Sequence, residues 1–259
     1  MKKLLFLFTS ICLLSTCFAF SSKPKQAYYQ ITVYHFKNDA QIKNVDAYLQ
    51  AAYIPALHRA GVSKVGVFKP LANDTAVDKK LYVFIPLKSL NQVDQIDISI
   101  WKDAQFLTDG ADYINASFDK TNFVRKEAIV LKAFDKMLDF AVPNLTGTPA
   151  EKIYELRSYE GPTEKMYRKK VSMFNDGGEV ALFIRLNFNA VFYGTVLAGS
   201  KMPNLMYMTS FNSQADRDAH WGTFKVDPEW KKLSAMPEYL NTVSKSEIIL
   251  MHATNYSEL

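Results

Sequence analysis

The sequence predicts an α+β fold in which two tandem ferredoxin-like β-α-β-β-α-β halves pack sheet to sheet as an intrachain α+β barrel. Three observations predict this fold. The same order of strand-like and helix-like segments occurs twice along the 259 residues. A stretch containing proline and glycine divides the two copies. The strand-like segments are apolar at nearly every position, which is typical of sheets covered on both faces.

The strands are expected to be four in each half, because β-branched and aromatic residues concentrate in short runs between turn residues. In the first half these runs cover residues 28–36, 62–69, 81–87 and 127–134. In the second half they cover residues 152–159, 190–198, 205–211 and 246–253. The halves themselves are assigned to residues 28–134 and 151–259, with a linker over 135–150.

The helices are predicted from apolar residues spaced three and four apart. One covers residues 40–60, where Pro55 is expected to kink it and Gly61 to end it. Ser89, with Gln92 three residues later, predicts a capping box at the start of an irregular helical region that reaches about residue 117.

The second half is expected to have helices over residues 163–175 and 179–186, and another that begins at Ser213. The side chain of Ser213, with an aspartate three residues later, predicts a helix cap. The pair Asp227-Pro228 predicts a turn that seats Trp230.

The duplication is also visible residue by residue. The matching positions are Tyr29, Ile31 and Tyr34 with Tyr154, Leu156 and Tyr159; Leu81 and Ser89 with Leu205 and Ser213; Trp101 with Trp221; and Glu127, Ile129, Leu131 and Ala133 with Glu247, Ile249, Met251 and Ala253. A sheet face left open would expose several hundred Å² of apolar surface and cost several kcal/mol, at about 25 cal/mol per Å². The sister sheet is therefore the expected cover, and a second chain is the alternative.

The N-terminus is typical of a signal peptide. Lys2 and Lys3 precede an apolar run over residues 4–14, and cleavage is expected after Ala19. The chain is therefore expected to be exported, either periplasmic or secreted. An alternative interpretation makes Cys17 the lipidated residue of a lipoprotein. Both cysteines, Cys12 and Cys17, lie in this segment, so a disulfide or thiolate site is not expected in the mature chain.

Composition excludes several classes of function. Lysine and arginine total 31 against 26 for aspartate and glutamate, and no basic run is present that would predict nucleic-acid binding. No transmembrane segment is expected after signal cleavage. No metal or cofactor is predicted, because the four histidines lack the spacing of paired ligands and no phosphate-binding or nucleophile motif occurs.

The second half resembles the NIPSNAP family. The matching motifs are Tyr154 to Tyr159 in a strand, Met206-Tyr207-Met208 in another, Arg217 to Trp221 in a helix, and Asp227-Pro228-Glu229-Trp230 after it. The first half resembles a divergent second copy that lacks the Glu-Leu-Arg triplet and the Asp-Pro-x-Trp corner. The resemblance implies the dimeric α+β barrel superfamily, which also holds cofactor-independent monooxygenases and haem-handling enzymes, but it implies no particular reaction.

A candidate ligand cleft is placed between the helices and the sheet of the second half. Its expected residues are Tyr154, Arg157, Tyr159, Tyr207, His220 and Trp221. Strand alternation puts Arg157 and Tyr159 on the face opposite to Tyr154. Arg157 either holds a ligand carboxylate or carbonyl, or pairs with Glu155 or Glu160 at the rim. His220 is either an ordinary hydrogen-bonded histidine or an axial haem ligand.

Three functions are consistent with this sequence. The first is an exported binding or interaction module with a small apolar or amphipathic ligand in the cleft. The second is a cofactor-independent or haem-linked oxidoreductase of the monooxygenase type, which uses Arg157 and a buried tyrosine or histidine. The third is a homo-oligomer in which the barrel mediates only self-association. Trp221, Phe224 and Trp230 are interpreted mainly as core residues.

Overall fold

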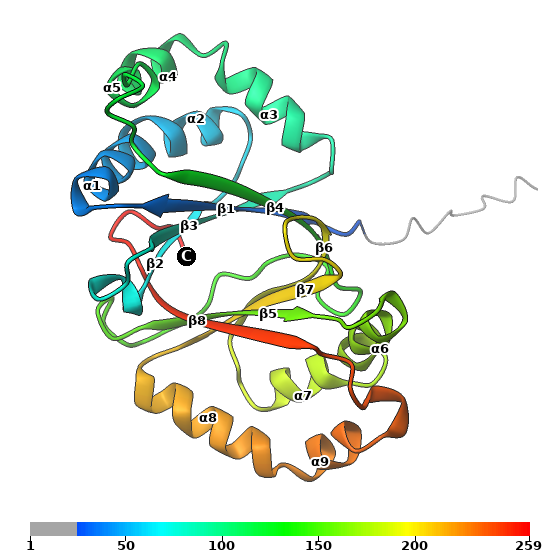
Figure 1. The fold of residues 1–259 in the computed structure, drawn as a ribbon. Helices are drawn as coiled ribbons and strands as arrows, with labels where there is room; N and C mark the ends of the chain where they lie inside the picture. Colours follow the sequence, from blue (N-terminus) through cyan, green and yellow to red (C-terminus); the bar gives the residue numbers. More distant parts are fainter. Residues whose placement is uncertain (1–24) are drawn as a thin grey trace, which may run out of the picture.

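The computed structural model describes residues 25–259, which form a closed barrel of antiparallel strands with helices packed on its outside (Figure 1). The strand order around the barrel is β1-β3-β2-β8-β5-β7-β6-β4. The predicted signal peptide, its cleavage site and the lipidation alternative lie outside the described residues. Within residues 25–259, no helix combines the length and apolar character needed to cross a bilayer.

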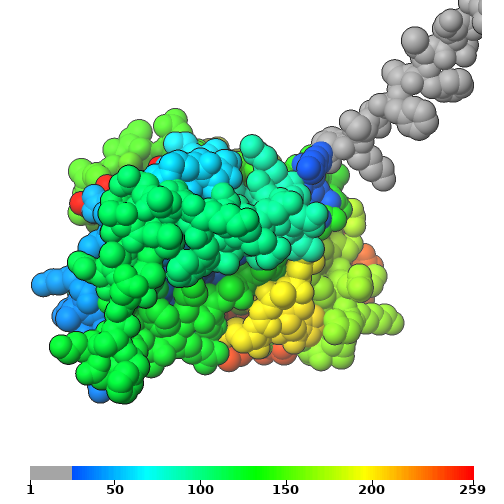
Figure 2. All heavy atoms as spheres, turned by 90° about the horizontal axis from the view of Figure 1, so that it is seen from above, coloured from blue at the N-terminus to red at the C-terminus, as the bar shows by residue number. Residues whose placement is uncertain are grey.

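The first half has the predicted β-α-β-β-α-β order. Its elements are β1 (Tyr28–Phe36), α1 (Asp39–Tyr48), α2 (Ile54–Arg59), β2 (Gly66–Pro70), β3 (Lys79–Leu87), α3 (Gln92–Ile100), α4 (Ala104–Asp109), α5 (Ala111–Ile114) and β4 (Arg125–Ala133). All pairs in its sheet are antiparallel, with the strand order β4-β1-β3-β2. The α2 to α5 layer, cyan to green, covers most of the face seen from above (Figure 2).

The second half repeats this topology. Its elements are β5 (Ile153–Glu160), α6 (Glu164–Asn175), α7 (Glu179–Arg185), β6 (Ala190–Ala198), β7 (Asn204–Phe211), α8 (Gln214–Val226), α9 (Pro228–Ser234) and β8 (Lys245–Ala253). The sheet order β8-β5-β7-β6 is that of the first half with each strand replaced by its counterpart. The predicted duplication of the fold is therefore confirmed.

Two equivalent seams join the halves into the barrel. Strand β2 pairs with β8, and β4 pairs with β6, both antiparallel. Strand β6 is the second-half counterpart of β2, and β8 is the counterpart of β4. The two seams are therefore related by an internal pseudo-twofold axis that runs along the barrel. Closure leaves neither sheet with an open edge, and the inner faces cover each other as predicted.

The first long helix differs in detail from the prediction. A π-helical segment over Leu49–Tyr53 separates α1 from α2, and Pro55 lies in the first turn of α2. Proline lacks the N–H that an α-helical bond there would need, so the wider turn just before it keeps the helix continuous. Gly61 ends the helix with φ of 89°, as expected for a glycine terminator.

The capping box predicted at Ser89 is wrong. Helix α3 begins at Gln92, and its N-cap residue, Asn91, makes no side-chain cap bond. The Gln92 side chain instead accepts a hydrogen bond from the backbone N–H of Lys88 at 2.5 Å. Trp101 follows α3 and is 53% exposed, so it does not occupy a buried position like that of Trp221, which is 6% exposed.

The cap predicted at Ser213 is confirmed, and the turn predicted at Asp227-Pro228 is the start of a further helix. The Ser213 hydroxyl accepts a hydrogen bond from the N–H of Asp216 at 3.1 Å and starts α8. The Asp227 carboxylate caps α9 through the N–H groups of Glu229 and Trp230, with Pro228 at the first helical position. This geometry fixes the corner that follows α8.

One end of the barrel is filled by side chains. Tyr29, Phe84 and Phe192 pack there with ring centroids 5.0 to 5.3 Å apart. Phe140, from the segment between the halves, adds a further ring 6.0 Å from Phe84. This segment is also tied to the barrel by backbone hydrogen bonds, such as Ala141 N–H to the carbonyl of Val191 at 2.9 Å. The linker is therefore part of the packed structure.

The C-terminal tail completes the edge where β8 ends. The Glu258 carboxylate accepts a hydrogen bond from the N–H of Val65 at 2.6 Å and contacts His58 Nε2 at 2.7 Å. The Ser257 hydroxyl accepts one from the N–H of Val67 at 2.9 Å. These side chains take the place of a strand partner, so β2 is shorter than the predicted run over 62–69.

Candidate functional site

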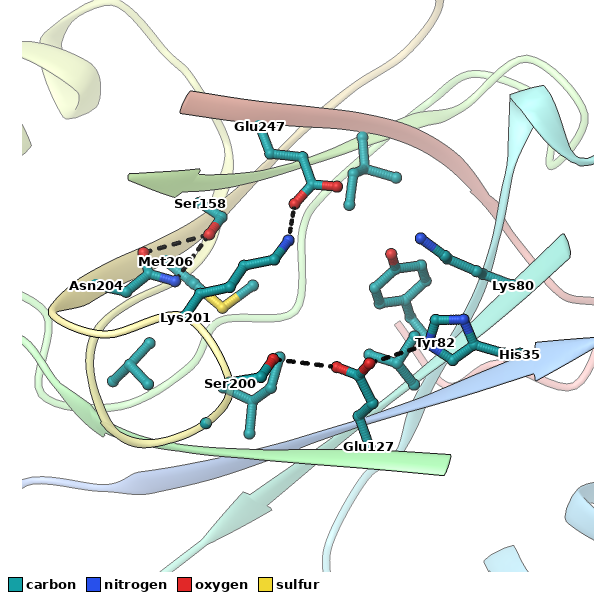
Figure 3. A pocket seen from close by; sticks show the side chains of 15 residues that line it. His35, Lys80, Tyr82, Glu127, Ser158, Ser200, Lys201, Asn204, Met206 and Glu247 are labelled. Carbon is teal, nitrogen blue, oxygen red and sulfur yellow. Dashed lines mark hydrogen bonds and ion pairs between the residues drawn. The ribbon is translucent and has the colours of Figure 1, made fainter. Parts of the chain in front are cut away.

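A cavity of about 140 Å³ opens at the other mouth of the barrel (Figure 3). Its wall is built from strand residues of both halves and from the loop between β6 and β7. The lining residues are Val33, His35, Lys80, Tyr82, Glu127, Ile129, Ser158, Val196, Gly199, Ser200, Lys201, Asn204, Met206, Glu247 and Ile249. The cavity therefore lies on the pseudo-twofold axis rather than within one half.

Strand alternation explains why these residues face inward. Along β1, Tyr29, Ile31 and Val33 belong to the barrel interior, and His35 is the next residue with the same orientation. Val33 lies opposite Tyr82 on one neighbouring strand and Glu127 on the other.

The second half supplies the symmetry-related set. Ser158 lies opposite Met206 and Glu247, as Val33 lies opposite Tyr82 and Glu127. The two acids are thus the same residue type in both copies, whereas the other paired positions have diverged.

The cavity has an apolar floor and a polar rim. The floor is formed by Val33, Ile129, Val196, Met206 and Ile249. The polar lining groups are acids, amines, hydroxyls, an amide, a phenol and an imidazole, of which Tyr82, Ser158 and Asn204 are buried. Such a division suits a molecule with an apolar body and a polar end.

His35 is the most constrained group of the rim. Its Nδ1 lies 2.9 and 3.0 Å from the two carboxylate oxygens of Asp78. Its Nε2 is buried, lies 3.4 Å from Glu127 Oε1, and has no hydrogen-bond partner within the described residues. Burial raises the pKa of Asp78, but the hydrogen bond and charge of His35 and the charge of Lys80 outweigh it and hold that pKa below its ordinary value.

The Glu127 carboxylate contacts two other side chains of the protein. Its carboxylate lies 3.0 Å from Arg125 Nε and accepts a hydrogen bond from the Ser200 hydroxyl at 3.4 Å. On the opposite wall, Lys201 donates to the Glu247 carboxylate. The Asn204 amide nitrogen donates to the Ser158 hydroxyl at 2.8 Å. The pair of Ser158 and Asn204 joins β5 to β7, whereas Ser200 and Lys201 belong to the loop between β6 and β7.

Tyr82 brings a phenol into the same part of the cavity as Lys80 (Figure 3). Burial, together with the charges of Glu247, Glu127 and Asp78, raises the pKa of Tyr82 well above its ordinary value. The phenol therefore stays protonated at physiological pH and can donate a hydrogen bond.

A second polar cluster lies between the sheet and the helices of the second half. Glu155 is completely buried and is its centre. Its carboxylate accepts hydrogen bonds from Arg157 Nε at 2.6 Å, Arg217 Nε at 2.8 Å and Trp221 Nε1 at 2.8 Å. Burial raises the pKa of Glu155, but these donors and charges outweigh it, and the pKa lies below its ordinary value of 4.5.

The cluster continues through Arg157. Its Nη1 donates to the Tyr159 hydroxyl at 3.0 Å, and that hydroxyl lies 2.9 Å from the Tyr207 hydroxyl. The guanidinium also stacks over the Trp221 ring, 3.6 Å from the centroid. These groups satisfy one another, which is the arrangement expected of a structural network.

A buried ion pair borders this cluster. Lys170 Nζ lies 2.8 Å from the Glu179 carboxylate, and both side chains are buried. Burial raises the pKa of Glu179, and the charges of Lys170 and Arg157 oppose that shift only in part. The ammonium also lies 4.7 Å from the centre of the Phe174 ring.

The second half of the chain matches the model of a known protein family. Residues 154–258 match the NIPSNAP family model. The C-terminal half of this chain is a NIPSNAP domain. The first half, which repeats the same strand order, is a second copy of that fold and lies outside the matched residues.

Solved structures match the NIPSNAP domain and its N-terminal partner together. A proposed monooxygenase from Lactobacillus acidophilus is 10% identical with a TM-score of 0.56, and the match covers 88% of this chain and 94% of that one. One from Fusobacterium nucleatum is 6% identical with a TM-score of 0.54, covering 88% and 92%. An anthrone oxidase-like protein is 8% identical with a TM-score of 0.52, and the match covers 88% of this chain and 92% of that one. These similarities show the two-copy barrel fold alone. No curated protein matches the chain.

Four of the predicted cleft residues of the NIPSNAP domain lie together. Arg157, Tyr159, Tyr207 and Trp221 all belong to the network around Glu155. The interpretation that pairs Arg157 with Glu155 is confirmed, although the pair is buried rather than at the rim. The polar atoms of these side chains are directed at each other.

The other two predicted residues lie elsewhere. Tyr154 faces the barrel interior, where its ring packs 4.8 Å from Phe68. His220 Nδ1 contacts the carbonyl of Asp216 at 2.8 Å, and its ring packs against Phe188 and Phe211. The interpretation of His220 as an ordinary hydrogen-bonded histidine agrees with these contacts. Trp221 and Phe224 are buried core residues as predicted, and Trp230 packs beside them.

The residues of the cavity were not predicted as a site. The signal that would find them is the alternation of β1, which places His35 after three interior residues, combined with the acids that begin β4 and β8 at equivalent positions. Within residues 25–259, no group of three or more histidine, cysteine, aspartate or glutamate side chains is arranged to hold a metal ion.

Proposed function

We propose that this protein binds a small amphipathic molecule in the cavity at the barrel mouth. One observation carries the proposal: the cavity joins an apolar floor to a rim of hydrogen-bonding and charged groups, inside a barrel whose other end is packed with side chains. Ligand sites in proteins commonly combine an apolar wall with a few placed polar groups.

The size of the cavity limits the ligand. A cavity of about 140 Å³ is similar to an engineered cavity of about 150 Å³ that takes up benzene. It is smaller than the roughly 300–1,000 Å³ of sites that enclose a drug-sized molecule. The proposed ligand therefore places one ring, or an aliphatic group of that size, on the floor and its polar end at the rim.

The monooxygenase-type alternative is supported only by the names of structural neighbours that share the fold. In this chain, Arg157 is paired with Glu155 and His220 contacts Asp216, so the residues chosen for that reaction face protein groups. The binding proposal uses a different set of side chains and does not depend on them.

Binding can be tested with single-ring probes that differ in the charge of the head group. Phenol, benzoate and benzylamine are added to the purified protein, and methyl NMR shifts of Ile129 and Ile249 on the cavity floor are followed. Replacement Ile249→Phe fills the floor and is expected to abolish saturable shifts. Ile248→Phe is the matched control, because the neighbouring residue is 47% exposed and does not line the cavity.

Two results would contradict the proposal. One is that none of the three probes gives a saturable shift. The other is that Ile248→Phe and Ile249→Phe change binding equally. Native mass spectrometry of the protein isolated from its own cells then asks which molecule it retains.

We also propose that the chain is exported after cleavage behind Ala19, from the basic and apolar pattern of its first residues. Protein recovered from its native host is expected to begin at Phe20 when its N-terminus is sequenced. Recovery of a lipidated Cys17 instead would support the lipoprotein alternative.

A further inference from the structure

The pairing of Asp78 with His35 fixes which imidazole nitrogen carries hydrogen. Asp78 is a carboxylate and can only accept hydrogen bonds, so the Nδ1 atom of His35, 2.9 Å away, must donate. In the neutral imidazole the lone pair is then on Nε2. His35 lines the cavity, and its Nε2 is buried without a hydrogen-bond partner within the described residues.

The surroundings also suit an imidazole that gains a proton. A proton on Nε2 would place the imidazolium between Asp78, at 2.9 Å, and Glu127, at 3.4 Å. Two carboxylates stabilise that charge, and such an arrangement is what a base needs after it has accepted a proton.

The same wall offers groups that would stabilise the negative charge left on a ligand. The Lys80 ammonium lies 3.4 Å from Asp78 and, with the Tyr82 hydroxyl, points into the cavity beside His35 (Figure 3). An ammonium and a neutral phenol are effective donors to a developing oxyanion. On the opposite wall, Met206 occupies the position equivalent to Tyr82, so that wall has no phenol at this place.

We propose that His35, oriented by Asp78, is a general base that removes a proton from a carbon acid bound in this cavity, a small carbonyl compound with hydrogen on the carbon next to the carbonyl group. This inference rests on the proposed binding function. It assigns the ligand its chemical class and gives the cavity an activity.

The step balances without an oxidant or a co-reactant. The C–H bond breaks and its hydrogen forms an N–H bond at Nε2. The electron pair of the C–H bond moves into a carbon–carbon double bond, and the carbonyl electron pair moves to oxygen, giving an enolate. Tyr82 and Lys80 donate hydrogen bonds to that oxygen. Return of the proton to the same or another carbon regenerates His35 and gives exchange or isomerisation.

The test uses phenylacetone, whose ring fits the cavity floor and whose methylene group is a carbon acid. Binding is measured first by methyl NMR shifts, and exchange of methylene hydrogen for deuterium in D2O is then followed by proton NMR. The protein is expected to accelerate exchange, and His35→Gln is expected to lower the rate about 100-fold or more while binding persists. His252→Gln is the matched control, because His252 contacts the Lys152 carbonyl and does not line the cavity.

Asp78→Asn separates positioning from structure. An amide in this place can donate to Nδ1 and favour the wrong tautomer, so exchange is expected to fall about 10-fold or more with binding retained. The charged and titratable groups that face His35 are Asp78, Lys80, Tyr82, Arg125 and Glu127.

The outcomes distinguish this proposal from the binding function. Phenylacetone that binds without accelerated exchange, or with equal exchange in the wild type and His35→Gln, overturns the general base and leaves ligand binding intact. Phenylacetone that does not bind, together with failure of the three single-ring probes, overturns both. Accelerated exchange that Ile249→Phe and His35→Gln each remove supports both.

Discussion

The carboxylate of Glu155 shows how one residue organises the helical side of the second half. It lies on a central strand, β5, and receives donors from the same strand and from α8. Arg157, Arg217 and Trp221 are thereby held in fixed positions. Buried charges of this kind need all their partners, because removing one leaves the others uncompensated.

Glu155→Gln is expected to destabilise the protein by about 3 kcal/mol at pH 7, because it leaves two arginines without their buried counter-charge. The measurement is urea unfolding followed by circular dichroism. Glu160→Gln is the control, since that carboxylate is at the strand end and lies 4.0 Å from Lys245. Equal losses in the two variants would contradict the central role of Glu155.

The pH dependence follows from the lowered pKa of Glu155. A carboxyl whose pKa is lower in the folded chain than in the unfolded chain stabilises the fold above the unfolded value and loses that contribution as pH falls through the folded value. The difference in unfolding free energy between the wild type and Glu155→Gln should therefore shrink below pH 4.5, the ordinary value for this group. A difference that stays constant between pH 7 and pH 3 would exclude this origin.

For single residues, the sequence predicted which face of the sheet a side chain occupies better than it predicted which residues that side chain contacts. Period-two alternation correctly put Arg157 and Tyr159 on one face and Tyr154 on the other. It did not reveal that α8 brings Arg217 to the same carboxylate, because that contact joins residues far apart in the chain. The sequence did not single out His35 for the same reason, since its contact with Asp78 depends on how β3 begins.

Two glycines of helical elements should respond to alanine in opposite directions. Gly61 ends α2 with φ of 89° and has open space where a Cβ would be. Gly61→Ala is therefore expected to cost about 1 kcal/mol from backbone strain without a steric clash.

Gly222 lies inside α8, and its Cβ would also meet open space. Gly222→Ala is expected to stabilise the protein by about 0.5–1 kcal/mol, because alanine loses less backbone entropy in a helix. Both values can be read from urea unfolding of the two variants. Changes of the same sign would contradict the assigned backbone roles.

At the scale of elements, strands and caps were predictable where the local sequence decides them. Residues 28–36 and 190–198 form β1 and β6 as predicted, and Ser213 caps α8. The ends of strand β2 could not be predicted from the sequence, because the C-terminal tail near Glu258 supplies its hydrogen-bond partners. The Ser89 cap failed because α3 starts only at Gln92, after a turn in which the Gln92 side chain binds the backbone of Lys88.

The whole molecule depends on mutual coverage of the two sheets. The closed strand order confirms the barrel that the duplicated apolar segments predicted. The candidate cavity was not predictable in the same way, because it appears only when the barrel closes and strands of both halves meet around it. Closure within one chain also means that a second copy is not needed to complete the sheet, so homo-oligomerisation stays a prediction.

Expression of residues 25–134 alone should expose the inner sheet face, including Tyr29, Ile31 and Phe84, together with the free edges of β2 and β4. This half is expected to self-associate or precipitate, and to give a 1:1 complex when coexpressed with residues 135–259. Size-exclusion chromatography with light scattering measures both results. A half that stays monomeric and folded would contradict mutual coverage.

Fusion of the two copies has a consequence for the cavity on the pseudo-twofold axis. In a barrel made from two identical chains, every side chain at such a mouth appears twice, and a lysine on one wall would confront the same lysine on the other. A single chain removes that restriction, since Lys80 can face Asn204 and Tyr82 can face Met206. Gene fusion thus permits a polarised chamber, in which each wall can change by mutation independently of its twin.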